Sequence, residues 1–346
     1  MRKMRLRRSK RSKPGVSIRR RTSLRRDGRR SAFVAATAAV VLIGGLALFP
    51  TPFYLLSPGT AVDLSRSVAV EGHVPTRRRF YLTDVTVTHA SLLLLLAGFV
   101  PGTRIVKHEL LVPAGQTMQS YDRVLSAAMD DSQHVAAYVA ERAAGLPLGA
   151  PSSRVEILDF TPASRAGRIL QVGDRLAFVA GRKIRHTGDV SQALEPLPAG
   201  TRVLVKIERD GRETTFQVPT IRTPAGTRFG IAVGERTITP ELPVPVHFSL
   251  ANVEGPSGGL MFALAIYAEL TGDRRALPPV AGTGTISADG TVGPIEGTQQ
   301  KIIAAERAGA STFLVPLQNY KDVRNERGIT VVPVATFAQA LAATRS

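Results

Sequence analysis

Residues Gly255–Leu270 read GPSGGLMFALAIYAEL, a glycine-rich turn that runs directly into a long apolar segment. Apolar residues recur at helical spacing in this segment and Gly272 follows it, so the pattern predicts a helix from Gly258 to Leu270. Ser257 stands at the start of that helix. A serine in this position can cap the helix by accepting a backbone N–H. It can also be a nucleophile placed beside N–H groups that stabilise an oxyanion, although the position alone favours the cap.

A second amphipathic segment, which carries a lysine on its apolar side, follows the serine. Residues 298–308 predict a helix that stops at Gly309, and Lys301 shares its face with an isoleucine and three alanines. Such a lysine either reaches solvent along its stem or is buried. Burial disfavours the ammonium and can lower the pKa from about 10.4 to about 7, as a general base requires. Since the last histidine is His247, Lys301 is a candidate base for Ser257.

The turn Gly255–Gly259 also matches G-x-S-x-G, the nucleophile elbow of α/β-hydrolases. That fold needs an acid and then a histidine after the serine. No histidine follows Ser257, so the hydrolase order is excluded. A serine-lysine dyad, in which lysine activates the hydroxyl, is the remaining catalytic hypothesis.

Several motifs in fixed order resemble the proteolytic domain of Lon-type serine peptidases over residues 225–346. The resemblance implies that Ser257 is the nucleophile, Lys301 the general base and Thr283 the residue that orients the lysine. It also implies an oxyanion hole of backbone N–H groups, with Gly255 and Pro256 as supporting residues. The motifs are Glu254–Phe262, Ala281–Ile286, Asp289-Gly290, Val292–Ile295, Gly297, Lys301 and Phe313–Pro316.

Two further points qualify this resemblance. Gly258 stands where the family usually has alanine, which adds backbone freedom but removes no catalytic group. The sequence contains no G-x-x-x-x-G-K-[ST] phosphate-binding motif, so this chain offers no ATP-driven unfolding. Substrates are then expected to be exposed loops, tails or unfolded segments. No cofactor or metal is expected.

Residues 151–222 resemble a PDZ domain in the order and spacing of their short strands, glycines and an Asp210-Gly211 hairpin. PDZ domains bind a peptide as an added strand beside a helix. The resemblance therefore implies a peptide site near the helix predicted at Val190–Leu197. Gly145–Gly149 is a candidate carboxylate-binding loop, or simply a linker turn after the preceding helix.

Residues 51–150 predict a mixed α/β segment without evident chemistry. Phe80–Thr88 alternates like a strand, and Tyr121–Ala144 has helical spacing. Leu92–Val100 is too short to cross a membrane and is interpreted as a buried helix or strand. The histidines of this segment stand singly and suggest no metal site.

The N-terminal region has the pattern of a membrane anchor. Residues 1–30 hold fifteen Lys or Arg and one acidic residue, a charge of +14 out of +18. Ser31–Phe49 is uncharged and 19 residues long, which predicts one transmembrane helix at 31–50. The positive-inside rule then places residues 1–30 in the cytoplasm and the catalytic domain outside. A cleaved signal peptide is the alternative, against which the long basic region and long apolar run argue.

The fold class predicted from these observations is an α+β multi-domain chain similar to the membrane-anchored PDZ-Lon proteins of Gram-positive bacteria. The predicted function is an ATP-independent serine endopeptidase of the cell membrane that cleaves exposed or unfolded protein segments outside the cytoplasm. A non-catalytic membrane-anchored PDZ scaffold that binds peptide C-termini is the alternative. The basic tail could bind nucleic acid, but attraction to anionic lipids explains it without that partner. Lon-like domains commonly form rings, so the resemblance also implies a homo-oligomer.

Overall fold

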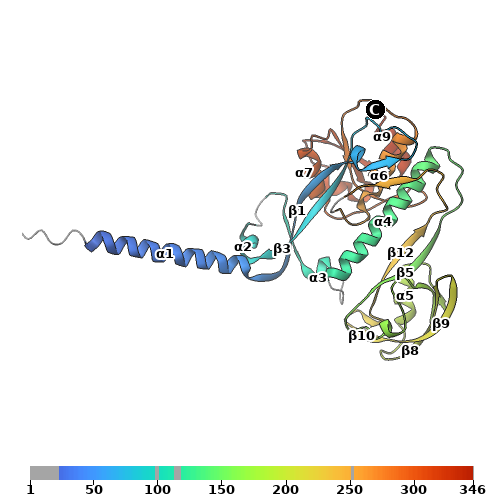
Figure 1. Cartoon of the computed structure of the whole chain (residues 1–346), viewed down its shortest axis with the longest axis horizontal. Coiled ribbons are helices and arrows are strands. Elements are labelled where there is room, and N and C mark those ends of the chain that lie inside the picture. The colour runs from blue at the N-terminus through green and yellow to red at the C-terminus, as the bar shows by residue number, and fades with distance from the viewer. Residues whose placement is uncertain (1–22, 98–100, 113–117, 251–252, 346) are drawn as a thin grey trace, which may run out of the picture.

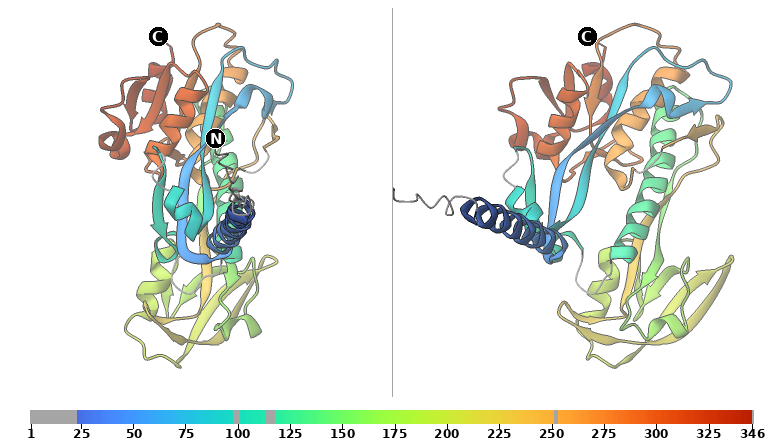
Figure 2. Two further views of the ribbon diagram at one scale, coloured as in Figure 1. Left: turned by 90° about the vertical axis from the view of Figure 1, so that its left-hand side faces the viewer. Right: turned by 60° about the vertical axis from the view of Figure 1, so that its left-hand side comes forward.

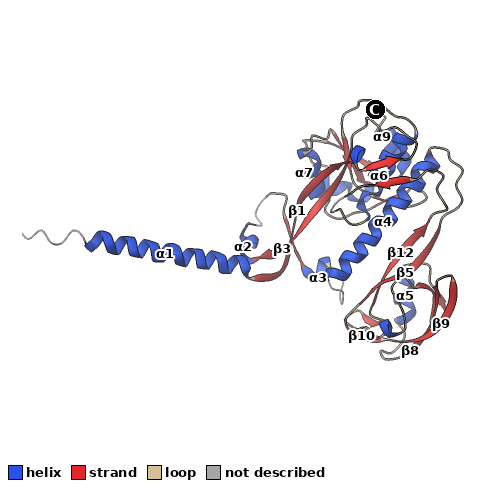
Figure 3. Cartoon of the chain, in the orientation of Figure 1, coloured by secondary structure: helices blue, strands red, loops and turns tan. Residues whose placement is uncertain are grey.

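The computed structural model describes residues 23–97, 101–112, 118–250 and 253–345. Two units, each built on a sheet, lie on either side of the long helix α4 (Met118–Ala143), and helix α1 (Ser23–Leu48) projects away from them (Figure 1). Figure 3 distinguishes the mixed helix-and-strand unit, which carries the C-terminus, from the mainly β unit. The mixed α/β character predicted for the chain is confirmed.

The first unit contains a six-stranded sheet in the order β18-β17-β14-β3-β1-β4. β3, β14, β17 and β18 run parallel, whereas β1 is antiparallel to both of its neighbours. Strands from residues 51–150 and from the C-terminal third therefore share one sheet. Its strands are β1 (Pro50–Asp63), β3 (Phe80–Ser91), β4 (Arg104–Lys107), β14 (Val280–Gly282), β17 (Thr312–Pro316) and β18 (Thr330–Val334).

Successive side chains of the central strands supply two separate cores, because strand side chains alternate between faces. Phe80 and Leu82 of β3 pack in one apolar cluster with α4 and α6 (Gly259–Leu270). Tyr81 lies between them in sequence and packs in another cluster with α7 (Thr298–Arg307). The helices that carry the serine and the lysine thus approach the sheet from opposite faces.

Smaller elements complete this unit. They are η1 (Leu64–Arg66), β2 (Val68–Val70), α2 (Leu92–Ala97), α3 (His108–Leu111), β13 (Val246–Phe248), η3 (Pro256–Gly258), β15 (Thr285–Ile286), β16 (Val292–Gly293), η4 (Leu317–Asn319), α8 (Tyr320–Val323) and α9 (Phe337–Ala343).

Most elements predicted for this unit are present. The predicted helices correspond to α4, α6 and α7, and Gly272 and Gly309 follow the last two with positive φ. The predicted strand corresponds to β3. The run Leu92–Val100 forms the short helix α2, but Leu92 and Leu94 are more than a third exposed, so the prediction of a buried element is wrong for them. Residues 98–100 of that run lie outside the described residues.

The second unit is an antiparallel sheet in the order β12-β5-β6-β8-β9, with β7 paired to β6. Its apolar core is shared with α5 (Thr187–Leu194). The predicted hairpin is present, and Asp210 and Gly211 turn with positive φ. The remaining elements are β5 (Ser152–Phe160), β6 (Arg175–Val179), β7 (Arg182–Lys183), β8 (Arg202–Arg209), β9 (Arg212–Pro219), β10 (Ile221–Thr223), β11 (Gly226–Arg228) and β12 (Ile231–Ile238).

Two features of this arrangement differ from the expected division of the chain. β12 pairs with β5, so the second unit extends to Ile238, beyond the predicted boundary at residue 222. Helix α4 contacts α6 of the first unit as well as β5 and β12 of the second (Figure 2). The second unit is thus inserted in the chain between α4 and β13, both of which belong to the first unit.

The prediction of a transmembrane helix at 31–50 is wrong. Among the residues that the structure describes, no helix combines the length and apolarity needed to cross a membrane. The part of α1 free of Asp, Glu, Lys and Arg runs from Ser31 to Leu48, about 27 Å at 1.5 Å per residue against a core of ~30 Å. Ala, Gly, Ser and Thr make up more than half of it. The predicted orientation of the chain depended on this span and loses its basis.

Candidate active site

The nucleophile loop, residues Gly255–Ser257, enters α6 through the 3₁₀ turn η3. Gly255 has φ 85° and ψ 161°, a conformation that is essentially restricted to glycine. Pro256 occupies the first position of the turn, where its missing N–H leaves no hydrogen bond unmade. The local sequence therefore places Ser257 on a sharp turn at the start of a buried helix.

Tight packing accounts for the glycine at position 258. A Cβ there would lie 2.8 Å from Leu82 Cδ1 and 3.0 Å from Phe262 Cε2. The space that an alanine methyl would need is thus filled by a leucine of β3 and by an aromatic ring of α6. The departure from the usual alanine follows from these neighbours.

Lys301 and Ser257 are hydrogen-bonded to each other. Lys301 Nζ donates to Ser257 Oγ at 2.7 Å, and only 4% of the lysine is exposed. Its Nζ also lies 3.1 Å from the carbonyl oxygen of Thr83. The lysine is therefore buried and does not reach solvent along its stem. The Ser257 side chain contacts this amine, and the N-cap position of α6 is Gly258.

Burial lowers the pKa of Lys301 to about 8, because the ammonium is removed from water; the carboxylate of Asp84 opposes the shift. At pH 7 about a tenth of such a lysine is uncharged, compared with well under a thousandth at an ordinary pKa. The site therefore supplies a neutral amine, hydrogen-bonded to a hydroxyl, near neutral pH. This is the arrangement that a general-base lysine needs.

Thr83 and Asp84 of β3 contribute to the site, but the sequence did not point to them. The carboxylate of Asp84 accepts hydrogen bonds from the Thr60 N–H and, at 3.4 Å, from the Thr60 hydroxyl. A Cβ at Gly59 would overlap this carboxylate, so a larger residue there would displace the Asp84 side chain. The alternating pattern of β3 predicts a strand and does not identify which carbonyl faces a lysine. The sequence feature that could have drawn attention to this strand is the carboxylate of Asp84 within the alternating pattern.

Thr283 lies between the two predicted catalytic residues. Its fully buried hydroxyl donates to the Ser257 carbonyl oxygen at 3.1 Å and accepts from Lys301 Nζ at 3.3 Å. The Gly284 N–H donates to the same carbonyl at 2.8 Å. Thr283 follows directly after β14, so the end of this strand fixes the backbone of Ser257 and the head of Lys301 together.

Substitution of Thr283 by valine is expected to lower kcat about 10- to 100-fold, because a hydrogen bond to a charged group contributes about 1.5–3 kcal/mol. Valine keeps the shape and removes only the hydroxyl. Thr283→Ser, which restores the hydroxyl, should recover most of the activity. Steady-state kinetics on a short peptide measures both variants, and a wild-type kcat for Thr283→Val would contradict the positioning role.

The structure narrows the donors available for an oxyanion at the nucleophile loop. The Gly255 N–H donates to the Leu125 carbonyl oxygen at 3.1 Å, and Pro256 has no N–H. Of the three residues, the Ser257 N–H is therefore left to face a developing negative charge. It lies at the beginning of η3 and α6, where the helix dipole favours an anion.

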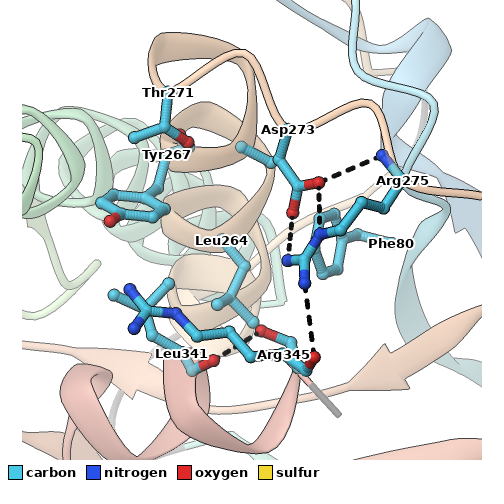
Figure 4. Close-up of a pocket in the computed structure, with 10 residues that line it drawn as sticks. Phe80, Leu264, Tyr267, Thr271, Asp273, Arg275, Leu341 and Arg345 are labelled. Atoms are coloured by element: carbon cyan, nitrogen blue, oxygen red, sulfur yellow. Dashed lines mark hydrogen bonds and ion pairs between the residues drawn. The ribbon is translucent and has the colours of Figure 1, made fainter. Parts of the chain in front are cut away.

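A cavity of about 220 Å³ lies away from these residues, with Phe80, Leu264 and Tyr267 among its lining (Figure 4). None of Ser257, Thr283 or Lys301 lines it. On one side Arg275 forms an ion pair with Asp273 at 2.8 Å and donates to the Arg345 carbonyl at 3.3 Å. These contacts tie Arg275 to both Asp273 and the Arg345 backbone at the rim of the cavity.

Comparison with known proteins supports a proteolytic domain in the C-terminal third. Residues 238–341 match the family model of the Lon protease (S16) C-terminal proteolytic domain. The chain is 48% identical over 71 residues to the Lon protease of Roseiflexus castenholzii, covering 20% of this chain and 9% of that protein. It is 37% identical over 94 residues to the Lon protease of Campylobacter jejuni, covering 25% and 12%. The chain thus spans about a tenth of the length of these curated relatives.

Among solved structures, the PDZ domain of an SdrC-like protein from Listeria monocytogenes is similar to this chain. The match covers 25% of this chain and 93% of that one, with 12% identity and a TM-score of 0.22. A score this low carries no argument for the fold. The PDZ-like nature of residues 151–222 stays a prediction.

Proposed function

We propose that this chain is a serine endopeptidase that cleaves peptide bonds through an acyl-enzyme on Ser257, with Lys301 as the general base. The observation that carries the proposal is the 2.7 Å hydrogen bond between Ser257 Oγ and the buried Lys301 Nζ. The similarity of residues 238–341 to Lon proteolytic domains supports the same reaction class.

In the first half of the reaction, uncharged Lys301 accepts the hydroxyl proton while Ser257 Oγ attacks the substrate carbonyl carbon. The negative charge that develops on the carbonyl oxygen is stabilised by the Ser257 N–H. The ammonium formed at Lys301 is held by the Thr83 carbonyl and the Thr283 hydroxyl, at 3.1 and 3.3 Å. It then protonates the departing amine, which leaves the acyl group on Ser257.

In the second half, uncharged Lys301 removes a proton from water, which attacks the acyl carbon and releases the new carboxylate. Ser257 Oγ takes back the proton from the ammonium, so the site returns to its starting state. Each half thus uses the same amine first as a base and then as an acid. A pKa of about 8 suits both roles near neutral pH.

A non-catalytic scaffold would gain nothing from the buried lysine. Holding a lysine with a pKa of about 8 instead of 10.5 in a folded protein costs about 3 kcal/mol at neutral pH. No ion pair offsets this cost within 4 Å of Lys301 Nζ in the described part of the chain. A cost of this size is typical of functional sites rather than of structural lysines.

For the mainly β unit we propose binding of extended peptide segments along the edge of β12. β12 is the end strand of its sheet, and α5 contacts it and β11. An exposed edge strand can accept a further strand through backbone hydrogen bonds. Unfolded segments and chain ends can adopt the extended conformation that this edge would bind. They also need no ATP-driven unfolding, and the sequence contains no ATP-binding motif.

The proposed activity is tested by incubating the purified chain with a chemically unfolded, fluorescently labelled protein without ATP. Wild-type protein should release labelled peptides, and Ser257→Ala should release none. Mass spectrometry of the products identifies the cleaved bonds. An equal rate of release by Ser257→Ala would contradict the proposal.

The rate of cleavage should rise with pH and level off above about pH 8. The reason is that Lys301 must be uncharged to accept the serine proton, and burial lowers its pKa to about 8. The measurement is kcat/KM for a peptide without titratable groups between pH 6 and 10. A rate that falls over this range would contradict lysine as the base.

A further inference from the structure

Helix α4 holds the nucleophile loop through two contacts. The Leu125 carbonyl oxygen accepts the Gly255 N–H at 3.1 Å, and the Ser132 hydroxyl donates to the Pro256 carbonyl oxygen at 3.1 Å. Leu125 and Ser132 are seven residues apart, so they lie on the same face of the helix. Ser132 is 5% exposed, and a Cβ at Gly259 would lie 2.8 Å from its Oγ. The two hydrogen bonds thus fix the loop on both sides of Pro256.

The residue before Ser132 holds α4 to the other unit. Asp131 accepts the Thr237 N–H at 2.7 Å, and Thr237 belongs to β12. Arg123, also on α4, makes a second contact with this unit, an ion pair with Asp159 of β5 at 2.9 Å. Adjacent residues of α4 therefore contact the mainly β unit on one side and the nucleophile loop on the other. Figure 2 shows α4 reaching from the mainly β unit to the mixed helix-and-strand unit.

The bond between Asp131 and Thr237 lies on the edge of β12 that is not paired with β5. Thr237 pairs with Ser153 of β5, but its N–H goes to Asp131, so this N–H faces away from β5. The register between Val233 and Ile238 is regular, and N–H groups alternate in direction along a strand. Val233 and Glu235 therefore direct their N–H groups to the same edge. The next N–H along this edge, that of Thr237, donates to Asp131. This is the edge to which a peptide strand would add.

We propose that α4 is a positioning element for the nucleophile loop, coupled to edge strand β12 through Asp131, so that displacement of this edge changes the reactivity of Ser257. Asp131 and Ser132 are positioning residues in this account, since neither touches the reacting atoms. The effect on cleavage rests on the proposed peptidase function. The coupling of β12 to the loop does not, because it can be measured without catalysis.

The coupling is tested by amide hydrogen exchange at Gly255 in the full chain carrying Ser257→Ala, and by kcat and KM for a short peptide in the chain with Ser257. Asp131→Ala removes the acceptor, and its control is Asp130→Ala, which removes the neighbouring exposed carboxylate. Thr237→Pro removes the donor, and Thr237→Ser is its control because it keeps both the backbone N–H and a side-chain hydroxyl. Ser132→Ala has the exposed Ser126→Ala as its control.

We expect Asp131→Ala, Thr237→Pro and Ser132→Ala each to raise Gly255 exchange several-fold and to lower kcat about tenfold with little change in KM. Asp131→Asn keeps an acceptor oxygen and should restore most of both values, and the controls should match the unsubstituted chain. Unchanged Gly255 exchange in folded Asp131→Ala and Thr237→Pro would overturn the coupling. If the unsubstituted chain cleaves no peptide, the peptidase proposal fails, and the exchange data still decide the coupling.

Discussion

Replacement of Lys301 by alanine is expected to reduce kcat by roughly 10⁴-fold or more, and Ser257→Ala should have an effect of similar size. The double variant should be no worse than either single one, because the proton cannot be transferred once one partner of the 2.7 Å pair is missing. Lys301→Arg should be equally inactive. A guanidinium stays protonated at neutral pH and cannot accept the serine proton.

The measurement is single-turnover hydrolysis of a fluorogenic peptide, with each variant checked for folding by circular dichroism. Lys321→Ala, which alters an exposed lysine of α8, is the matched control and should keep full activity. Substantial hydrolysis by Lys301→Arg would remove the lysine from the role of base. Additive effects of the two alanine substitutions would mean that the serine and lysine act separately.

Replacement of Lys301 by methionine should make the protein more stable while it destroys activity. The pKa of Lys301 is about 8 in the folded chain, below its ordinary value of 10.5 in an unfolded chain. The unfolded state therefore binds more protons between these pH values, so the stability of the unsubstituted chain rises with pH through this window. Below pH 8 the full penalty of about 3 kcal/mol applies. Methionine has a similar length and no charge, so it removes this penalty.

The free energy of unfolding, measured with urea for Lys301→Met and for the unsubstituted chain, tests this expectation. At pH 7 the variant should be more stable by about 3 kcal/mol, and the difference should vanish above about pH 10.5. Lys321→Met, in which an exposed lysine is replaced, should change stability by less than about 0.5 kcal/mol. A loss of stability at pH 7 for Lys301→Met would mean that the lysine contributes to the fold as a charged group.

The sequence predicted most reliably those elements whose spacing of apolar residues depends on a single helix or strand. The helical spacing after Ser257 and around Lys301 predicted α6 and α7, but the apolar face around Lys301 left open whether the lysine is buried or reaches solvent. The alternation over Phe80–Thr88 predicted β3. These are local properties, because a helix or strand that buries one face must repeat its apolar residues with its own period.

Contacts between distant segments were not predictable in the same way. Residues 51–150 supply most of β1 and all of β3 to the sheet that also contains β14, although Phe80 and Val280 are about 200 residues apart in the sequence. No local pattern shows that the Thr83 carbonyl faces Lys301, or that Ser132 contacts Pro256. The transmembrane prediction failed for a different reason. The count of uncharged residues extended past Leu48, where α1 ends, and included weakly apolar alanines and glycines.

The central claim is that Ser257 forms a covalent acyl intermediate because Lys301 removes its proton. The most direct test is the mass of the peptide fragment containing Ser257, taken after rapid acid quenching during turnover of a peptide ester. The account predicts an acyl adduct on Ser257 in the unsubstituted chain and no adduct at this position in Lys301→Ala, where the serine is present without its base. An equal amount of adduct on Ser257 in Lys301→Ala, or turnover with no adduct on Ser257 in the unsubstituted chain, would contradict it.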